Sequence, residues 1–172
     1  FGDGSAVEFF ALDELGDEAV ERGYVSVLHV YRHLAADDLP AASAAAERAT
    51  RVGSEHRDQD LLALGLCAQG RLTMYSGRIA DGLRLLDEAM VTVLDGQLAP
   101  FISGTLYCHT IAACHEVVDV RRMTRWTDLA ERWLTTFPAA VFFGGLCGVH
   151  RAQLLLLRGE WAEAEQVALR VV

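Results

Sequence analysis

The sequence contains no Lys, no Asn and only three Pro, and each absence narrows what the chain can be. All 15 basic residues are Arg, which together with the abundant Ala indicates GC-rich coding DNA, as in many bacteria. The scarcity of Pro and the absence of a Gly/Ser-rich run give no sign of a flexible linker. Because just over half of the residues are hydrophobic, we expect all 172 to fold as one domain with its own core.

Long apolar runs are also missing, since the longest, such as LLLL at 154–157, fall far short of the roughly 20 residues that span a bilayer. The first residues lack the features of a secretion signal, so we expect a cytoplasmic protein without membrane contact. The net charge of −9 repels phosphate backbones and argues against direct nucleic-acid binding by this segment. The basic run at 121–125 fits a solvated helix end. The chain lacks an initiator Met and stops within a helical pattern, so we expect it to be part of a longer protein.

Helical periodicity dominates the sequence, and the alternation typical of strands is nearly absent. Ser5 and Glu8 form a capping box, and Asp58 is placed to cap a later helix. Gly53 and Gly77 are interpreted as helix ends. After a short helix that ends at residue 16, we expect helices at about 17–36, 40–52, 58–76, 79–94, 100–118, 124–136, 145–158 and 160–172.

These helices come in pairs that share a spacing of small residues. Gly70 precedes the turn glycine Gly77 by seven positions, Gly82 follows it by five, and the same spacing recurs in 152–171. Small side chains at these positions let the two helices of a pair approach closely. The pattern resembles the tetratricopeptide repeat, in which Gly70, Gly82 and Ala89 match the small-residue positions. The resemblance implies an all-α solenoid of antiparallel helix pairs, with irregular repeat spacing and a degenerate third repeat.

A solenoid of this kind implies an extended groove, lined by the first helix of each pair, that binds a protein, a peptide or another domain of the same chain. The same residues could instead pack against the rest of a longer protein. The predicted binding residues are Tyr31, Arg71, Tyr75, His109, Glu116 and Gln153. Further lining residues are Tyr24, Val27, Leu64, Cys67, Met74, Leu146 and Val149.

Four motifs carry a closer resemblance: GRIADGLRLLDEAM (77–90), YCxxIxACxEVxDxRR (107–122), WTDLAERW (126–133) and FxGxCxxHRAxLLxLRGEWAEAE (143–165). Together they cover a little over half of the chain and resemble the helical-repeat region of bacterial LuxR-type transcriptional regulators, related to MalT-like repeats. The resemblance implies a non-catalytic interaction or sensory domain, with the DNA-binding helix-turn-helix outside this chain. A sensor that closes around a small apolar effector is the alternative.

The stretch 107–117 contains two Cys, two His and a Glu, which are residue types that hold zinc. Cys108 and His115 share a helix face, but seven residues separate them by about 10.5 Å along the axis. Zinc bonds of about 2.0–2.3 Å cannot join such a pair, so we expect no metal and no cofactor. The predicted buried stripe of this helix consists of Tyr107, Ile111, Cys114 and Val118.

Catalytic patterns are equally weak. Cys147 and His150 lie three residues apart and can touch on one helix, but we interpret them as a packed thiol and a hydrogen-bonded imidazole. Cys108 lies in mid-helix, where no helix end lowers the pKa of a thiol. Trp126 and Trp133 share a face and are expected to pack in the core. No phosphate-binding loop occurs, so the chain is predicted not to be an enzyme; one using the Cys and His residues is the last alternative.

Overall fold

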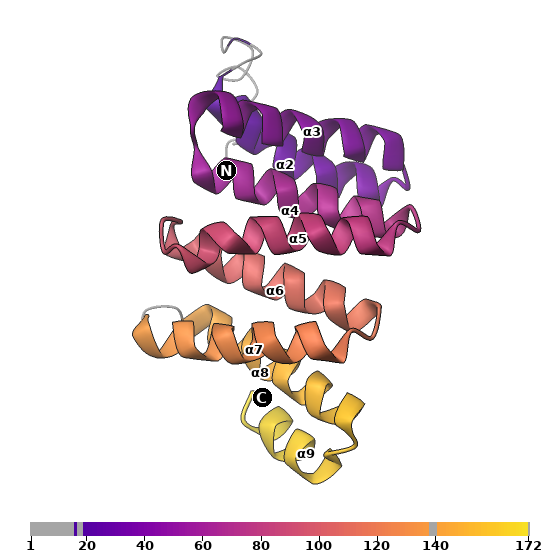
Figure 1. Ribbon diagram of the computed structural model, residues 1–172, viewed down its shortest axis with the longest axis vertical. Helices are drawn as coiled ribbons and strands as arrows, with labels where there is room; N and C mark the ends of the chain where they lie inside the picture. The colour runs from indigo at the N-terminus through magenta and orange to yellow at the C-terminus, as the bar shows by residue number, and fades with distance from the viewer. Residues whose placement is uncertain (1–15, 17–18, 138–140, 172) are drawn as a thin grey trace, which may run out of the picture.

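The computed structural model describes residues 16, 19–137 and 141–171, and within them the chain forms eight α-helices and no strand (Figure 1). The predicted all-α fold is therefore confirmed. The predicted capping box at Ser5 and Glu8 lies outside the described residues. The helices are α2 (Val20–Ala35), α3 (Leu39–His56), α4 (Gln59–Tyr75), α5 (Ile79–Leu94), α6 (Pro100–Glu116), α7 (Val120–Thr136), α8 (Val141–Arg158) and α9 (Trp161–Leu169).

The helices stack in chain order, from α2 and α3 at one end of the molecule to α9 at the other (Figure 1). Each helix packs against the next one along the chain. In addition, α2 contacts α4, α4 contacts α6 and α6 contacts α8. The even-numbered helices therefore form a continuous row, and this row carries most of the residues predicted to bind a partner.

Aspartates cap three of these helices. The side chains of Asp38, Asp58 and Asp119 each accept a hydrogen bond from the backbone amide three residues later, at 3.0 Å in each case. Such caps satisfy one of the amides that a helix start leaves without a partner. Gly77 and Gly159 follow α4 and α8 with φ of 85° and 77°, a conformation that glycine adopts without strain. Asp58 thus caps its helix as predicted, and both turn glycines lie where expected.

One predicted helix end was wrong. Gly53 does not end its helix, since α3 continues to His56 and the glycine is buried within it. The helix α4 passes so close that an ideal Cβ on Gly53 would lie 2.5 Å from the backbone nitrogen of Leu62. The glycine therefore serves the packing of α3 on α4, although it looks like a terminator in the sequence.

The connection after α6 also differs from the prediction. Val118, a predicted member of the buried stripe of α6, instead follows the helix with φ of 58° and exposes 61% of its surface. Because Asp119 caps α7, that helix begins at Val120 rather than near residue 124. The other members of the stripe, Tyr107, Ile111 and Cys114, are buried as predicted.

The close approach of α4 and α5 is confirmed at the small residues that predicted it. An ideal Cβ on Gly70 would lie 2.9 Å from the carbonyl oxygen of Gly82, and one on Gly82 would lie 2.5 Å from the carbonyl oxygen of Gly70. Ala89, the third small residue, is fully buried. The backbones of the two helices are therefore in direct contact.

The largest hydrophobic cluster extends from α4 to α8. Trp126 is buried in it, and Trp133 packs against it with its ring centroid 5.8 Å from that of Tyr107. The prediction that both tryptophans pack in the core is confirmed. The large side chains of this cluster that are fully buried are Leu86, Met90, Leu106, Ile111, Met123 and Leu154.

Candidate functional site

Most of the predicted binding residues meet on the row of even-numbered helices. Gln153 is the exception, because it lies on α8 with its Oε1 atom 3.2 Å from Nδ1 of His150. The others come from α2, α4 and α6, and hydrogen bonds connect them into one group, which we call the Arg71 cluster. The Arg71 cluster consists of Tyr31, Arg71, Tyr75, His109 and Glu116.

Arg71 joins α4 to α6. Its guanidinium donates to Oε1 of Glu116 at 2.7 Å and to the carbonyl oxygen of His109 at 3.4 Å. It also donates to the hydroxyl of Tyr75, whose ring centroid is 5.3 Å from the guanidinium carbon. Burial lowers the pKa of Arg71, but Tyr75 and Glu116 outweigh this effect and raise it. The side chain is therefore a permanent cation that two helices hold in place.

Tyr31 and His109 form an uncharged pair beside this cation. The Tyr31 hydroxyl is 3.3 Å from Nε2 of His109, and the ring centroids are 5.9 Å apart. Burial raises the pKa of Tyr31. Burial, together with the charge of Arg71, lowers the pKa of His109. Both groups are consequently neutral near pH 7.

A pocket of about 260 Å³ lies between α2, α4 and α6, next to these side chains. Its rim is polar and includes Tyr31, Arg71, Tyr75 and His109. Cys67 also lines the pocket, and burial raises the pKa of its thiol to about 12, so this cysteine stays protonated and unreactive. The apolar lining residues are Val30, Leu34, Leu64, Ala68 and Leu106.

Three of the predicted lining residues have other roles. Met74 and Val27 are buried in hydrophobic clusters, and Met74 lies against α5 at Gly82. The hydroxyl of Tyr24 donates to the carboxylate of Asp58 at 3.1 Å. Helical spacing predicts which residues share a face of α2 or α4. It does not predict that the neighbouring helices α3 and α5 cover the sides of that face.

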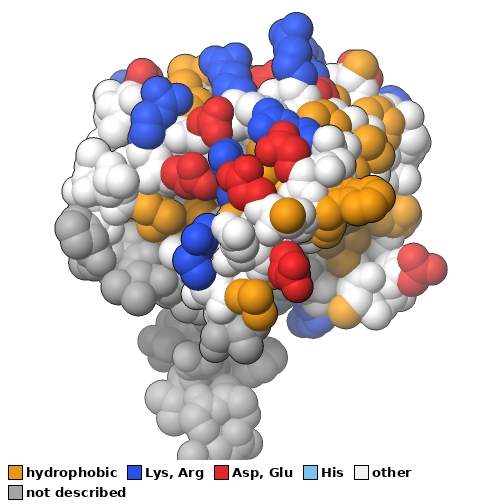
Figure 2. Space-filling model, turned by 90° about the horizontal axis from the view of Figure 1, so that it is seen from below, with side chains coloured by type: hydrophobic (Ala, Val, Ile, Leu, Met, Phe, Trp, Pro, Cys, Tyr) orange, Lys and Arg blue, Asp and Glu red, His pale blue; other side chains and the backbone are white. Residues whose placement is uncertain are grey.

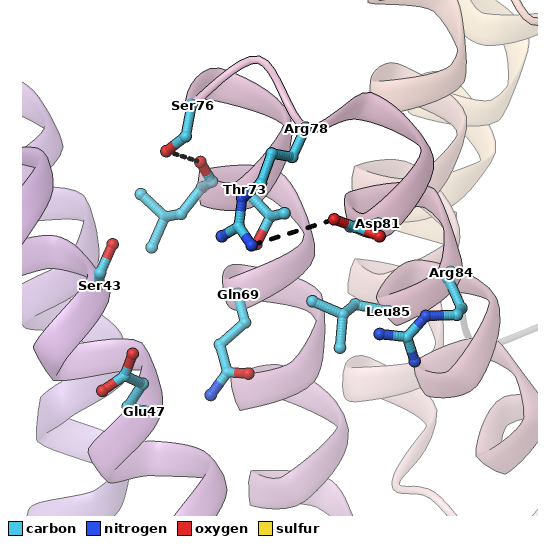
Figure 3. A pocket seen from close by; sticks show the side chains of 10 residues that line it. Ser43, Glu47, Gln69, Thr73, Ser76, Arg78, Asp81, Arg84 and Leu85 are labelled. Carbon is cyan, nitrogen blue, oxygen red and sulfur yellow. Dashed lines mark hydrogen bonds and ion pairs between the residues drawn. The ribbon is translucent and has the colours of Figure 1, made fainter.

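A second hollow of about 340 Å³ lies between α3, α4 and α5 (Figure 3). Its lining is mainly polar and includes both signs of charge, with Arg78 and Asp81 paired at 4.0 Å. Both of these side chains are mostly exposed, so water screens their charges. Leu72 and Leu85 are its only apolar lining residues, and none of its polar lining residues is buried, so this hollow is the weaker candidate for a binding site.

Cys108, Cys147 and His150 form another group, which we call the thiol cluster. The interaction with Cys147 on α8, followed by that with His150, lowers the pKa of Cys108 on α6 below its ordinary value of 9.0 despite burial. The same thiol–thiol interaction, together with burial, raises the pKa of Cys147. Sequence reasoning identified the Cys147–His150 spacing but missed Cys108, because only the packing of α6 on α8 brings it there.

The basic run at 121–125 belongs to the first turns of α7. Arg122 forms ion pairs with Asp87 at 3.2 Å and with Asp119 at 2.7 Å. The guanidinium of Arg125 lies over the ring of Trp126. Acidic and basic side chains therefore alternate here, and they also mix on the α9 end of the molecule (Figure 2).

Hydrophobic side chains gather along one edge of the α9 end in the same view (Figure 2). On α8 and α9 the exposed large apolar residues include Leu156, Leu157, Leu169 and Trp161, of which Trp161 exposes 72% of its surface.

Residues 16, 19–137 and 141–171 contain no group of three His, Cys, Asp or Glu side chains arranged to hold a metal ion. Over the same ranges, no helix combines the length and apolar character that crossing a bilayer requires.

Comparison with known proteins identifies no relative of this chain. The chain matches no protein-family model, no curated protein and no solved structure. The resemblance to the helical-repeat region of LuxR-type regulators therefore stays a prediction, and the Arg71 cluster must be interpreted from its own geometry.

Proposed function

We propose that this chain is a tetratricopeptide-like helical-repeat domain that binds a protein or peptide along its even-numbered helices and catalyses no reaction. The convergence of the Arg71 cluster carries this proposal, because three helices that are distant in sequence bring four of its residues to the lining of one pocket and the fifth, Glu116, into contact with Arg71. The serial contacts of α2, α4, α6 and α8 support a repeat arrangement. So does the backbone contact of α4 with α5 at Gly70 and Gly82.

The size of the pocket favours a peptide over a whole effector molecule. Pockets for drug-sized ligands typically measure about 300–1,000 Å³. The pocket at Arg71 measures about 260 Å³ and is one of several shallow hollows. It suits one apolar side chain of a longer ligand. The apolar floor also suits a small hydrophobic effector, which makes such a sensor the second candidate.

The rim suits a carboxylate next to that apolar side chain. Glu116 pairs with Arg71 at 2.7 Å, and the side chains are 16% exposed for Arg71 and 44% exposed for Glu116. Water reaches the Glu116 carboxylate, so this carboxylate can turn to solvent when a ligand carboxylate takes its place on the guanidinium. Arg71 then offers its planar guanidinium for a charge-assisted hydrogen bond. The ligand we propose is thus a peptide with an apolar anchor next to an acidic residue or a free C-terminus.

The wider role rests on the resemblance alone. We place the domain in a cytoplasmic bacterial transcriptional regulator, where docking of the partner changes how an output domain is presented. The partner is another protein or a further domain of the same chain. An enzyme remains the last alternative, and the pocket does not favour it because its only thiol, Cys67, stays protonated.

The test is selection of peptides from a random display library on the immobilised chain, followed by affinity measurement. Arg71→Gln removes the cation, and Arg84→Gln is the matched control because Arg84 pairs with Glu88 at 3.9 Å on the solvated face of α5. Hydrogen bonds to charged groups contribute about 1.5–3 kcal/mol, so Arg71→Gln should weaken binding by roughly 10- to 100-fold.

Equal weakening by both variants, or none by Arg71→Gln, would contradict the proposal. A sharp fall in the melting temperature of Arg71→Gln would show instead that Arg71 serves the core. A small molecule found by mass spectrometry in the purified protein, and lost from Arg71→Gln, would favour the sensor.

A further inference from the structure

The α9 end of the molecule presents an apolar surface that the proposed peptide site does not use (Figure 2). We propose that this surface binds an amphipathic helix of a partner protein, which lies along α8 as α6 lies along α4. The proposal rests on the repeat arrangement and is independent of the Arg71 cluster. The exposed large apolar side chains that form this surface, which we call the α8–α9 surface, are Leu146, Val149, Leu156, Leu157, Trp161 and Leu169.

Four turns of the same kind define the period of the chain. Asp37, Gly77, Val118 and Gly159 each follow an even-numbered helix with a positive φ, between 56° and 85°. These turns recur at intervals of 40, 41 and 41 residues. In the last three helix pairs, residues that lie 41 or 82 positions apart therefore occupy equivalent places.

The places on α4 that are equivalent to the α8–α9 surface are covered. Cys67 and Met74 expose 4% and 5% of their surfaces and belong to the hydrophobic cluster that continues into α6. Their equivalents on α8 are Val149 and Leu156, which expose 42% and 56%. Single exposed hydrophobic residues are common, but a group of them at places that are covered elsewhere marks an interaction surface. The face of α8 thus keeps the apolar character of a face over which another helix lies.

The second helix of each pair shows a related change. Asp87 on α5 forms an ion pair with Arg122 on α7 at 3.2 Å. Its equivalent on α7, Asp128, forms an ion pair with Arg151 on α8 at 3.2 Å. In both cases the arginine comes from the following helix pair. On α9 the same place holds Leu169, which exposes 71% of its surface, so an apolar side chain is the expected neighbour there.

The contacts between α4 and α6 show how the partner helix would lie. Asp60 near the start of α4 accepts a hydrogen bond at 2.9 Å from the amide of Ala99, which directly precedes α6. Arg71 near the end of α4 pairs with Glu116, the last residue of α6. The two helices therefore run parallel, and we expect the partner helix to run parallel to α8.

Charges on α9 add to the chemistry expected of the partner. Thr124 on α7 accepts a hydrogen bond at 2.7 Å from Arg158, the last residue of α8. The equivalent of Thr124 on α9 is Glu165, which is exposed, as are the preceding Glu160 and Glu163. A parallel partner helix would bring its C-terminal end to these carboxylates. An Arg or Lys at that end suits both the carboxylates and the helix dipole.

Charge also favours this partner over a second copy of the chain. Each copy carries a net charge of −9, so two copies repel each other, whereas a basic helix is attracted. The partner is therefore a helix about as long as α8, with an apolar stripe and an Arg or Lys in its last turn.

The test is selection of helical peptides from a phage-displayed library on the immobilised chain. The peptides have the 18-residue length of α8, a fixed apolar stripe and random residues elsewhere. We expect the selected peptides to carry Arg or Lys in the last turn, and fluorescence anisotropy measures their affinity. If no peptide is selected, or if the last turn shows no enrichment of basic residues, the proposal is wrong.

Variants locate the selected peptide on the surface. Leu156→Glu should weaken its binding at least about tenfold, because the peptide would bury this side chain. Leu28→Glu is the matched control, since Leu28 exposes 66% of its surface on α2 at the other end of the molecule, and it should have no effect (Figure 1). Circular dichroism checks the fold, and Leu169→Glu is a second variant of the same surface. Equal weakening by Leu156→Glu and Leu28→Glu would overturn the proposal.

Arg71→Gln separates this surface from the proposed peptide site. The variant should bind the selected helix as the unchanged chain does, whichever way the test of the Arg71 cluster turns out. A helix that Arg71→Gln weakens and Leu156→Glu does not would lie at the Arg71 cluster, against the proposal.

The contact at Glu165 is tested by a double-mutant cycle. Glu165→Gln should weaken the selected helix up to about fivefold, as expected for an exposed ion pair. Replacement of the basic residue of the peptide by Gln should cause no further loss in that variant. Losses that simply add would contradict the pairing.

Sedimentation velocity distinguishes a partner protein from a second copy. We expect the unchanged chain to remain monomeric at concentrations that saturate the selected helix. A dimer that Leu156→Glu dissociates would show that a second copy covers the α8–α9 surface, and the partner helix would then be the wrong occupant.

Discussion

The contact between Gly70 and Gly82 makes the sharpest prediction about stability. Gly82→Ala places a Cβ 2.5 Å from the carbonyl oxygen of Gly70 and 3.0 Å from the backbone nitrogen of Met74. Both are backbone atoms, which cannot rotate away as the end of a flexible side chain can. Real Cβ contacts lie at 3.0 Å or more, so α5 must move away from α4 along a buried interface.

Two effects of opposite sign decide the magnitude. Replacing Gly by Ala within a helix stabilises it by about 1 kcal/mol, because the chain loses less conformational entropy on folding. Overpacking of a tight interface costs about 1–3 kcal/mol and occasionally more. Since the clash is with backbone, we expect the upper part of this range and a net loss of about 1–2 kcal/mol. For a domain of this size the loss corresponds to about 2–8 °C in melting temperature.

Gly144→Ala in α8 is the matched control. Gly144 is exposed, and an ideal Cβ there would meet no atom within 4 Å. The same substitution should therefore stabilise the protein by up to about 1 kcal/mol. Urea unfolding followed by far-UV circular dichroism measures both variants. The reasoning is refuted if Gly82→Ala is as stable as the unchanged chain, or if both variants change stability in the same direction.

Two further predictions concern the start of α4. Asp58→Ala removes a helix cap and also the acceptor of the Tyr24 hydroxyl, whereas Asp38→Ala removes only a cap. In urea unfolding, Asp38→Ala should cost about 1 kcal/mol and Asp58→Ala clearly more; equal losses would show that Tyr24 contributes nothing. Burial, followed by Asp58, raises the pKa of Tyr24 to about 12. The folded state therefore binds the phenol proton more tightly than the unfolded state, and stability should fall as the pH rises from about 10 toward 12. Tyr24→Phe should make this decline in stability shallower. An unchanged decline in the variant would rule out the Tyr24 phenol as its cause.

Helix boundaries could be predicted where local chemistry sets them. The bounds of α5 agree with the prediction, because Gly77 and the pair Asp95–Gly96 act within one turn of the helix ends. Gly53 was misjudged because a glycine that admits a neighbouring helix looks the same in sequence as one that ends its own. Only the position of α4 distinguishes the two cases.

In the candidate site, too, local spacing could be predicted from the sequence, whereas contacts set by the position of a neighbouring helix could not all be predicted. Arg71 and Tyr75 lie one helical turn apart, so their shared face could be predicted from spacing. The contacts of Arg71 with His109 and Glu116 agree with the placement of α6 beside α4, which the repeat pattern implied. The effect of Cys147 on the pKa of Cys108 depends on the rotation of α6 and α8 about their own axes, which periodicity does not determine.

The helix α6 links the Arg71 cluster to α8, since Cys108 and His109 are consecutive residues on it. His109 faces Arg71 and Tyr31, whereas Cys108 faces Cys147 and His150 on the next even-numbered helix. A helix moves nearly as a rigid rod, so a shift of α8 against α6 on one flank would move the wall of the pocket on the other flank. Whatever binds at α8 and α9 would then change the affinity for a docked peptide, and a bound peptide would change the affinity at that end by the same factor.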